Sequence, residues 1–105
     1  MMRTIKTIVL EGYLYMLEDV DCSYPIVVDH EITLDEVKEY AEKYVKEQDF
    51  PSKTSKEMKD RIVKLAQDGY IDWKIEDYIK FIDLTDVLEP LRKKKVKITI
   101  EVIEQ

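Results

Sequence analysis

The feature that most constrains this fold is the β-rich sequence at both ends of the chain. Residues 3–17 are rich in β-branched and aromatic types, and near the other end Val96, Ile98, Ile100 and Val102 alternate with polar residues. Such alternation is typical of a half-buried strand. A lone strand leaves its backbone groups without partners, so we expect the two ends to join one sheet.

The N-terminal β-rich segment is expected to form a hairpin. Its strands cover about 3–17 and 24–29, and the acidic turn 18–21 lies between them. Gly12 suits a bulge or a sharp bend, and Pro25 suits a strand start or an edge, because it cannot donate a ladder hydrogen bond. On the first strand the even-numbered positions form the more apolar face: Ile8, Leu10, Leu14 and Met16.

The middle of the chain predicts two helices. The first covers about 34–48, and Thr33 with Glu36 forms a capping box at its start. The second covers about 55–68, begins at Thr54 and ends at Gly69. Apolar residues recur at helical spacing along both segments.

The segment 70–92 fits two interpretations. Its apolar residues predict helices over about 73–82 and 84–92, but Ile71, Trp73 and Ile75 alternate as they would in a strand. Pro90 lies inside the last helix, which must therefore be short or kinked.

These elements together predict an α+β fold in a single domain, 1–105. The sheet is small and antiparallel or mixed, and it combines the N-terminal hairpin with a C-terminal strand over about 95–103. Three or four helices cover it. The length suits one hydrophobic core and is too short for two.

Charge is distributed unevenly along the chain. The net charge is −6, and residues 11–50 hold twelve acids and three bases, whereas residues 51–105 hold eleven acids and twelve bases. An acidic surface opposes contact with phosphate and favours basic partners, although many acidic domains use their charge only for solubility. The chain has no asparagine and is rich in Lys, Glu and Ile, a bias that resembles proteins of hot environments.

Two observations predict a cytoplasmic location. The single cysteine, Cys22, cannot form an internal disulfide, and the start of the chain lacks the apolar run of a signal peptide. No stretch approaches the length of a membrane span.

The known catalytic patterns are absent. Two glycines and one histidine exclude a phosphate-cradling loop and make a zinc site improbable. Cys22 and His30 would form a catalytic pair only if the hairpin brought them together. Asp29, Glu36 and Lys38 match the order of a metal-dependent nuclease motif, but the last two fall on a helix instead of a strand. We therefore expect no enzyme, cofactor or metal, and a divalent-metal hydrolase is the third-ranked function.

The leading hypothesis is a protein-binding module, in one form a small acidic inhibitor or regulator of a basic or nucleic-acid-handling protein. Tyrosine is enriched at protein interfaces because it combines a large rigid surface with a polar tip. The candidate binding residues combine this type with the acidic turn: Tyr13, Tyr15, Glu18, Asp19, Asp21 and Tyr24. The competing interpretation is that helices cover this face and the tyrosines belong to the core.

Two further partners fit the sequence. The basic segments 52–64 and 92–97 suggest a small nucleic-acid-binding regulator as the second-ranked function, although Glu57 and Asp60 interrupt the first of them. A terminal strand with an open edge could also pair across a twofold axis and give a homodimer.

Overall fold

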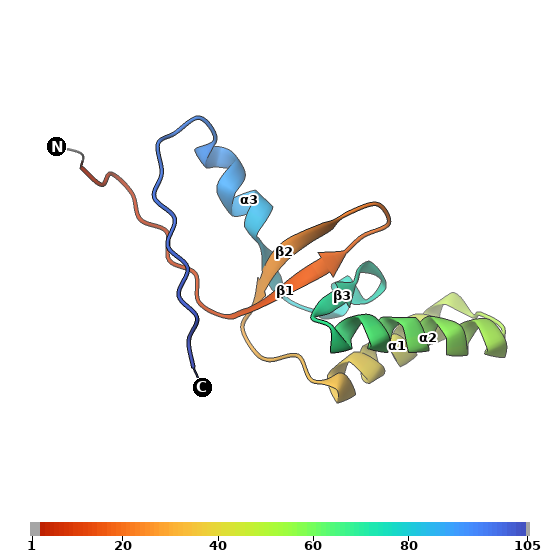
Figure 1. The fold of residues 1–105 in the computed structure, drawn as a ribbon. Coiled ribbons are helices and arrows are strands. Elements are labelled where there is room, and N and C mark those ends of the chain that lie inside the picture. Colours follow the sequence, from red (N-terminus) through yellow and green to blue (C-terminus); the bar gives the residue numbers. More distant parts are fainter. Residues whose placement is uncertain (1–2, 105) are drawn as a thin grey trace.

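A four-stranded mixed sheet in the order β3-β1-β2-β4 forms the centre of the computed structural model, which describes residues 3–104 (Figure 1). The predicted α+β architecture is confirmed. The elements follow in the order β1 (Tyr13–Glu18), β2 (Ser23–Val28), α1 (Leu34–Gln48), α2 (Ser52–Gln67), β3 (Tyr70–Asp72), the 3₁₀ helix η1 (Trp73–Tyr78), β4 (Phe81–Asp83), α3 (Leu84–Leu88) and the 3₁₀ helix η2 (Glu89–Leu91). The domain range given by the sequence also includes residues 1, 2 and 105, which lie outside the described part.

The predicted hairpin is present, with antiparallel pairing that runs from Tyr13 opposite Val28 to Glu18 opposite Ser23. The Asp19 amide closes the turn by donating to the Cys22 carbonyl at 2.8 Å. Pro25 lies where β4 does not reach, because β4 pairs only with Ile26, Val27 and Val28. The missing N–H of this proline therefore interrupts no pairing with β4.

The buried face of β1 is the odd-numbered one, although the even-numbered positions are the more apolar in sequence, and this confirms the interpretation in which helices cover the tyrosine face. Leu17 is 0% exposed, whereas Leu14 is 64% exposed. Leu17 packs with Ile26 and Val28 of β2 against residues of α1 and α2, so both helices cover this face. Tyr15 and Tyr24 also pack against this cluster, and a hydropathy scale underestimates the apolar area that their rings contribute.

The two long helices confirm the predicted pattern, with one correction at the start of α2. In α1 the Thr33 hydroxyl accepts a hydrogen bond from the Glu36 amide at 3.1 Å, as predicted. α2 begins at Ser52 and not at Thr54, with no side-chain cap at Pro51. The first turn forms earlier because the Ser55 amide donates to the Pro51 carbonyl at 2.9 Å, and the proline dihedral already suits a helix start.

Residues 70–92 form both short strands and short helices, so each of the two interpretations of this segment is correct in part. β3 pairs in parallel with β1, and β4 pairs antiparallel with β2. The helix predicted over 73–82 is shortened to the 3₁₀ helix η1, because Phe81–Asp83 is taken into the sheet. The helix predicted over 84–92 is divided into α3 and η2, and Pro90 lies in the latter.

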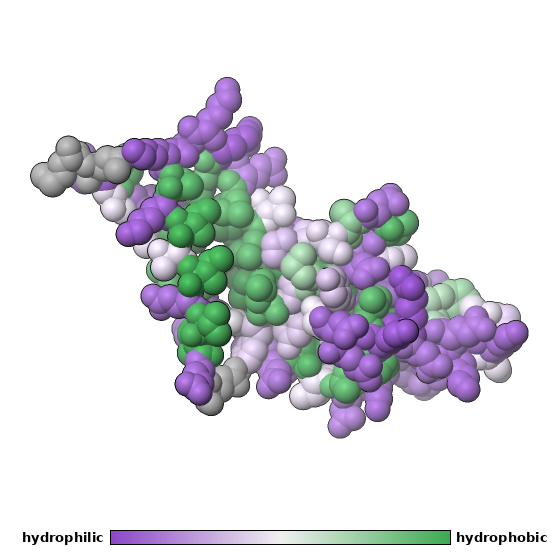
Figure 2. All heavy atoms as spheres, viewed as in Figure 1, coloured by the Kyte–Doolittle hydropathy of each residue, from purple (hydrophilic) through white to green (hydrophobic). Residues whose placement is uncertain are grey.

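The predicted C-terminal strand is not part of this sheet. Residues 95–104 have no strand pairing, and β3 and β4 occupy the places beside the hairpin. The first strand likewise begins at Tyr13 and not at residue 3. Both terminal segments extend from the end of the molecule opposite α1 and α2 (Figure 1), and apolar side chains follow the C-terminal one (Figure 2). They raise the radius of gyration to 17.1 Å, against about 13 Å for a compact chain of this length.

Gly12 lies where the N-terminal segment enters β1, and it contacts the backbone of β2. A Cβ atom here would lie 2.5 Å from the Val28 carbonyl oxygen. We expect Gly12→Ala to lower the free energy of unfolding by about 1–3 kcal/mol, because backbone atoms cannot move aside cheaply. Urea denaturation measures this, and the exposed neighbour Glu11→Ala, expected within about 0.5 kcal/mol, is the control. Equal effects of the two changes would contradict the close approach.

Candidate functional site

The turn of the hairpin borders a surface cavity of about 270 Å³. Glu18, Asp19 and Val20 come from the hairpin, Arg61 comes from α2, and the segment where β3 passes into η1 supplies the rest: Asp72, Trp73 and Lys74. The parallel pairing of β3 with β1 builds this cavity, because it sets Glu18 directly opposite Asp72. We call these seven residues and the neighbouring turn the hairpin end.

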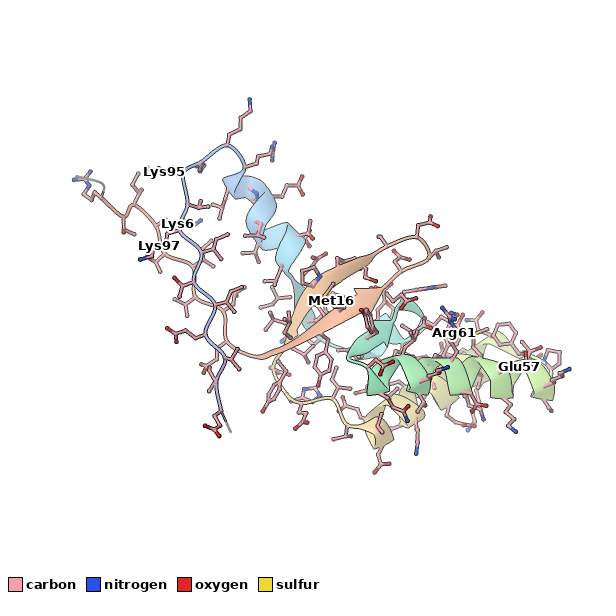
Figure 3. All side chains as sticks on the ribbon, in the orientation of Figure 1. Lys6, Met16, Glu57, Arg61, Lys95 and Lys97 are labelled. Atoms are coloured by element: carbon pink, nitrogen blue, oxygen red, sulfur yellow. The ribbon has the colours of Figure 1, made fainter. Side chains whose placement is uncertain are left out.

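Opposite charges alternate around the cavity. Arg61 Nη2 lies 3.5 Å from Glu18 Oε1, and Lys74 Nζ lies 3.3 Å from Asp72 Oδ1. The Lys74 ammonium also lies 5.1 Å from the centre of the Trp73 ring, a cation–π distance. Figure 3 shows Arg61 on α2, at the end of the molecule away from Lys95 and Lys97. The walls therefore carry both signs of charge and one aromatic ring.

Three acids near the cavity, Asp19, Glu76 and Asp77, form no ion pair within residues 3–104. Burial raises the pKa of the Glu76 carboxyl, and the negative charges of Asp77 and Asp19 raise it further. Burial also raises the pKa of Tyr24, with additional contributions from Glu76, Asp83 and Asp19. The carboxylates of Asp19 in the turn and of Glu76 and Asp77 in η1 thus repel one another here, and a basic ligand would reduce that repulsion.

The structure brings together only some of the predicted binding residues. Glu18 and Asp19 line the cavity, and Asp21 is exposed in the adjoining turn. Tyr24 is half-buried against the core. Tyr13 and Tyr15 lie toward the other end of β1, and the Tyr15 hydroxyl accepts a hydrogen bond from the Ile32 amide at 2.8 Å.

Sequence reasoning missed the four cavity-lining residues that lie outside the hairpin, namely Arg61, Asp72, Trp73 and Lys74. The alternation of Ile71, Trp73 and Ile75 was the available signal for β3, but nothing local indicates that this short strand pairs with β1. Asp72 caps η1 by accepting a hydrogen bond from the Lys74 amide at 3.0 Å. A capping aspartate of this kind is a recognisable local pattern.

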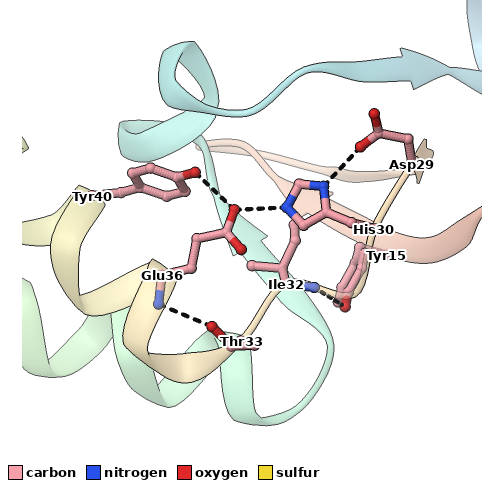
Figure 4. Close-up of polar contacts among 7 residues, drawn as sticks. All are labelled: Tyr15, Asp29, His30, Ile32, Thr33, Glu36 and Tyr40. Atoms are coloured by element: carbon pink, nitrogen blue, oxygen red, sulfur yellow. Dashed lines mark hydrogen bonds and ion pairs between the residues drawn. The ribbon is translucent and has the colours of Figure 1, made fainter.

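His30 joins the end of β2 to the start of α1 through two carboxylates (Figure 4). Its Nδ1 lies 2.7 Å from Asp29 Oδ1, and its Nε2 lies 2.8 Å from Glu36 Oε2. Both nitrogens can donate at once only in the imidazolium form, so these hydrogen bonds raise the pKa of His30. The Tyr40 hydroxyl donates to the same Glu36 oxygen at 2.7 Å, and burial together with this carboxylate raises the pKa of Tyr40 to about 12.

This histidine network should give a distinct dependence of stability on pH. Burial raises the pKa of Glu36, but hydrogen bonds from His30 and Tyr40 outweigh it, and the net shift is downward. The stabilisation is therefore complete between pH 4.5 and 6.5, the ordinary pKa values of the two groups. It is lost as the pH rises through the raised pKa of His30 or falls through the lowered pKa of Glu36.

An NMR titration of the His30 ring measures this prediction. We expect a pKa above 6.5 in the wild type, and we expect Glu36→Gln to bring it closer to that value because one carboxylate partner is lost. A wild-type pKa at or below 6.5 would contradict the hydrogen-bonded geometry.

Of the other catalytic candidates, only Asp29 and Glu36 come together, on either side of His30. Cys22 lies before β2 and His30 follows it, so the strand separates the two side chains. Glu36 and Lys38 lie on α1, as expected from the sequence. Within residues 3–104 no group of three or more His, Cys, Asp or Glu side chains is placed to hold a metal ion.

Comparison with known proteins gave no match: no family model, no curated protein and no solved structure matches this chain. Nor does any helix in the described residues have the length and apolar character needed to cross a membrane. The functional argument therefore rests on the geometry of the hairpin end.

Proposed function

We propose that this chain is a non-enzymatic protein-binding module whose hairpin end docks on a basic surface of another protein. The observation that carries the proposal is the convergence of Glu18, Asp19 and Asp72 on a cavity that also holds Trp73, with the Glu76 carboxyl of η1 close enough to feel the charge of Asp19. Covering the positively charged groove of a nucleic-acid-handling protein is one way in which such a module would inhibit its partner.

Two apolar side chains that line the cavity, Val20 and Trp73, support the proposal. Val20 is 76% exposed at the tip of the hairpin, and Trp73 is half-buried in the cavity wall. Protein interfaces typically combine an apolar or aromatic centre with a polar rim. Asp19 and Asp21 flank Val20 in the sequence and provide that rim.

The repulsion among the acids gives a physical reason for a basic partner. The raised pKa of Glu76 shows that its charge is disfavoured in the free chain. A lysine or arginine from the partner, with its stem on Trp73 and its charge beside Glu76 and Asp19, would lower that cost. Affinity should then fall as the salt concentration rises.

Photo-crosslinking in the cells that produce this protein tests the proposal. A benzophenone amino acid in place of Val20 should capture a basic protein, because this exposed side chain lines the cavity at the hairpin turn. The same probe in place of Ile82, an exposed apolar residue on β4, is the matched control and should capture much less of it. Equal capture from both positions would contradict the surface assignment.

Nucleic-acid binding is the second candidate, supported by the exposed basic run 92–97. On α2 the case is weaker, because Lys59 pairs with Glu42 at 3.1 Å and Arg61 pairs with Glu18. A gel-shift titration with DNA and RNA at low salt measures it. Binding that weakens steeply with salt would favour this candidate, and the absence of binding would exclude it.

A further inference from the structure

We propose that residues 96–102 of two copies pair as antiparallel strands about a twofold axis at Thr99, and that this pairing joins the chains into a homodimer. The surface is separate from the hairpin end, and the proposal is independent of the proposed function. Its starting point is a segment with the pattern of a strand that pairs with no other strand among residues 3–104.

The C-terminal segment has the backbone and the side chains of an unpaired strand. Among residues 3–104, no backbone hydrogen bond joins 95–104 to another element, and no strand partner is present there. Its apolar row consists of Val96, Ile98, Ile100 and Val102, whose exposed fractions run from 52% to 97%. Rows of exposed apolar, β-branched residues on an unpaired strand are the typical template for pairing with another chain.

The partner is a second copy of this chain, because the segment is complementary to itself. The sequence Val-Lys-Ile-Thr-Ile-Glu-Val reads as a palindrome in chemical type about Thr99. In an antiparallel pair centred there, Lys97 of each copy lies opposite Glu101 of the other. Val96 then lies opposite Val102, and Ile98 opposite Ile100. Isologous contacts require this relation, in which one patch fits itself after a twofold rotation.

Other arrangements fit less well. A parallel, in-register pair would set each Lys97 against the other and each Glu101 against the other, which is destabilising. An antiparallel pair centred on Ile98 sets Lys97 opposite Thr99, and one centred on Ile100 leaves Lys97 opposite Ile103. Centring between two residues would place apolar side chains opposite polar ones.

The position of the segment favours the contact. It extends from the end of the molecule opposite α1 and α2 (Figure 1), and apolar side chains run along it (Figure 2). In the dimer the two apolar rows lie on the same face of the ribbon and can pack together.

Disulfide trapping tests both the dimer and its register. On a background of Cys22→Ser, Thr99→Cys should crosslink two copies on mild oxidation, because directly opposed residues have Cα atoms about 4.5–5.5 Å apart. Lys97→Cys alone should not, because its two copies would lie about 13 Å apart along the strands. Mixing Lys97→Cys with Glu101→Cys should restore the crosslink. Equal crosslinking by every variant, or by none, would overturn the proposal.

Sedimentation with charge-exchanged variants provides a second measurement. The wild type should reach twice its 12.5 kDa mass at high concentration. Lys97→Glu should weaken the dimer about tenfold, because two favourable cross-strand pairs become two repulsive ones. Adding Glu101→Lys should recover the wild-type dissociation constant. A monomer at all concentrations, or a double variant no tighter than the single one, would contradict the paired strands.

Discussion

Replacing Leu17 with Ala should lower the free energy of unfolding by about 2–5 kcal/mol. Leu17 is 0% exposed on β1, an interior strand of the sheet, and it belongs to the cluster formed by this sheet and the two long helices. Truncation removes apolar contacts and leaves a cavity that the packed surroundings can fill only in part. Urea denaturation followed by circular dichroism measures the loss.

Leu14→Ala is the matched control on the same strand. Leu14 points to the opposite face and is 64% exposed, so its truncation should change the free energy of unfolding by less than about 0.5 kcal/mol. The pair of variants reports which face of β1 the helices cover. A larger loss for Leu14 than for Leu17 would mean that the strand is turned over.

The second large effect is expected for Asp72→Ala, at roughly 3 kcal/mol. The Asp72 side chain is 3% exposed and accepts hydrogen bonds from both the backbone amide and the ammonium of Lys74. Its removal uncaps η1 and leaves a largely buried ammonium without its carboxylate. Equilibrium unfolding at neutral pH measures the effect.

Asp83→Ala provides the comparison for this second effect. Asp83 caps α3 in the same way, by accepting from the Thr85 amide at 2.8 Å, but it is less buried. We expect a loss of about 1 kcal/mol, typical of a helix cap alone. Equal losses for the two aspartates would show that the Lys74 ion pair adds nothing to stability.

The parts of the fold that depend on local sequence were predictable. α1 combines a capping box at Thr33 with apolar residues at helical spacing, and both signals act within a few residues. β3 and β4 have three residues each, too few to show a period. They become strands because β1 and β2 offer them hydrogen-bonding partners, which is a tertiary effect.

The C-terminal segment shows what the local sequence pattern could not predict. Alternation from Val96 to Val102 predicts a strand and its apolar face, but it does not say which strand lies beside it. We assumed a partner within the chain, and β3 and β4 take those places instead. The palindromic charge pattern was present in the sequence, and we propose a role for it because the segment has no strand partner within the part of the chain that the structure describes.

The sequence predicted acidic residues of the candidate site, but it did not predict the other residues that line the cavity. Glu18 and Asp19 follow from the acidic turn. Arg61 and Trp73 are more than forty residues away in the sequence, and the parallel pairing of β3 with β1 brings them to the hairpin end. Of the two interpretations of the tyrosines, the one that places them in the core is confirmed for Tyr15 and Tyr24, which pack against the buried cluster.

The hairpin turn points away from the terminal segments in Figure 1. The proposed dimer therefore leaves both hairpin ends free, and two linked sites can engage a repeated or dimeric partner more tightly than one site.

The measurement that tests the central claim most directly is the affinity of the crosslinked partner for a charge-reversed hairpin end. We predict that Asp19→Lys with Asp21→Lys weakens binding about 100-fold at low salt and reduces its salt dependence. Asp86→Lys with Glu89→Lys changes the net charge equally on α3 and η2 and should have a much smaller effect. Unchanged affinity of the first variant, or an equal loss in the second, would contradict the hairpin end as the binding surface.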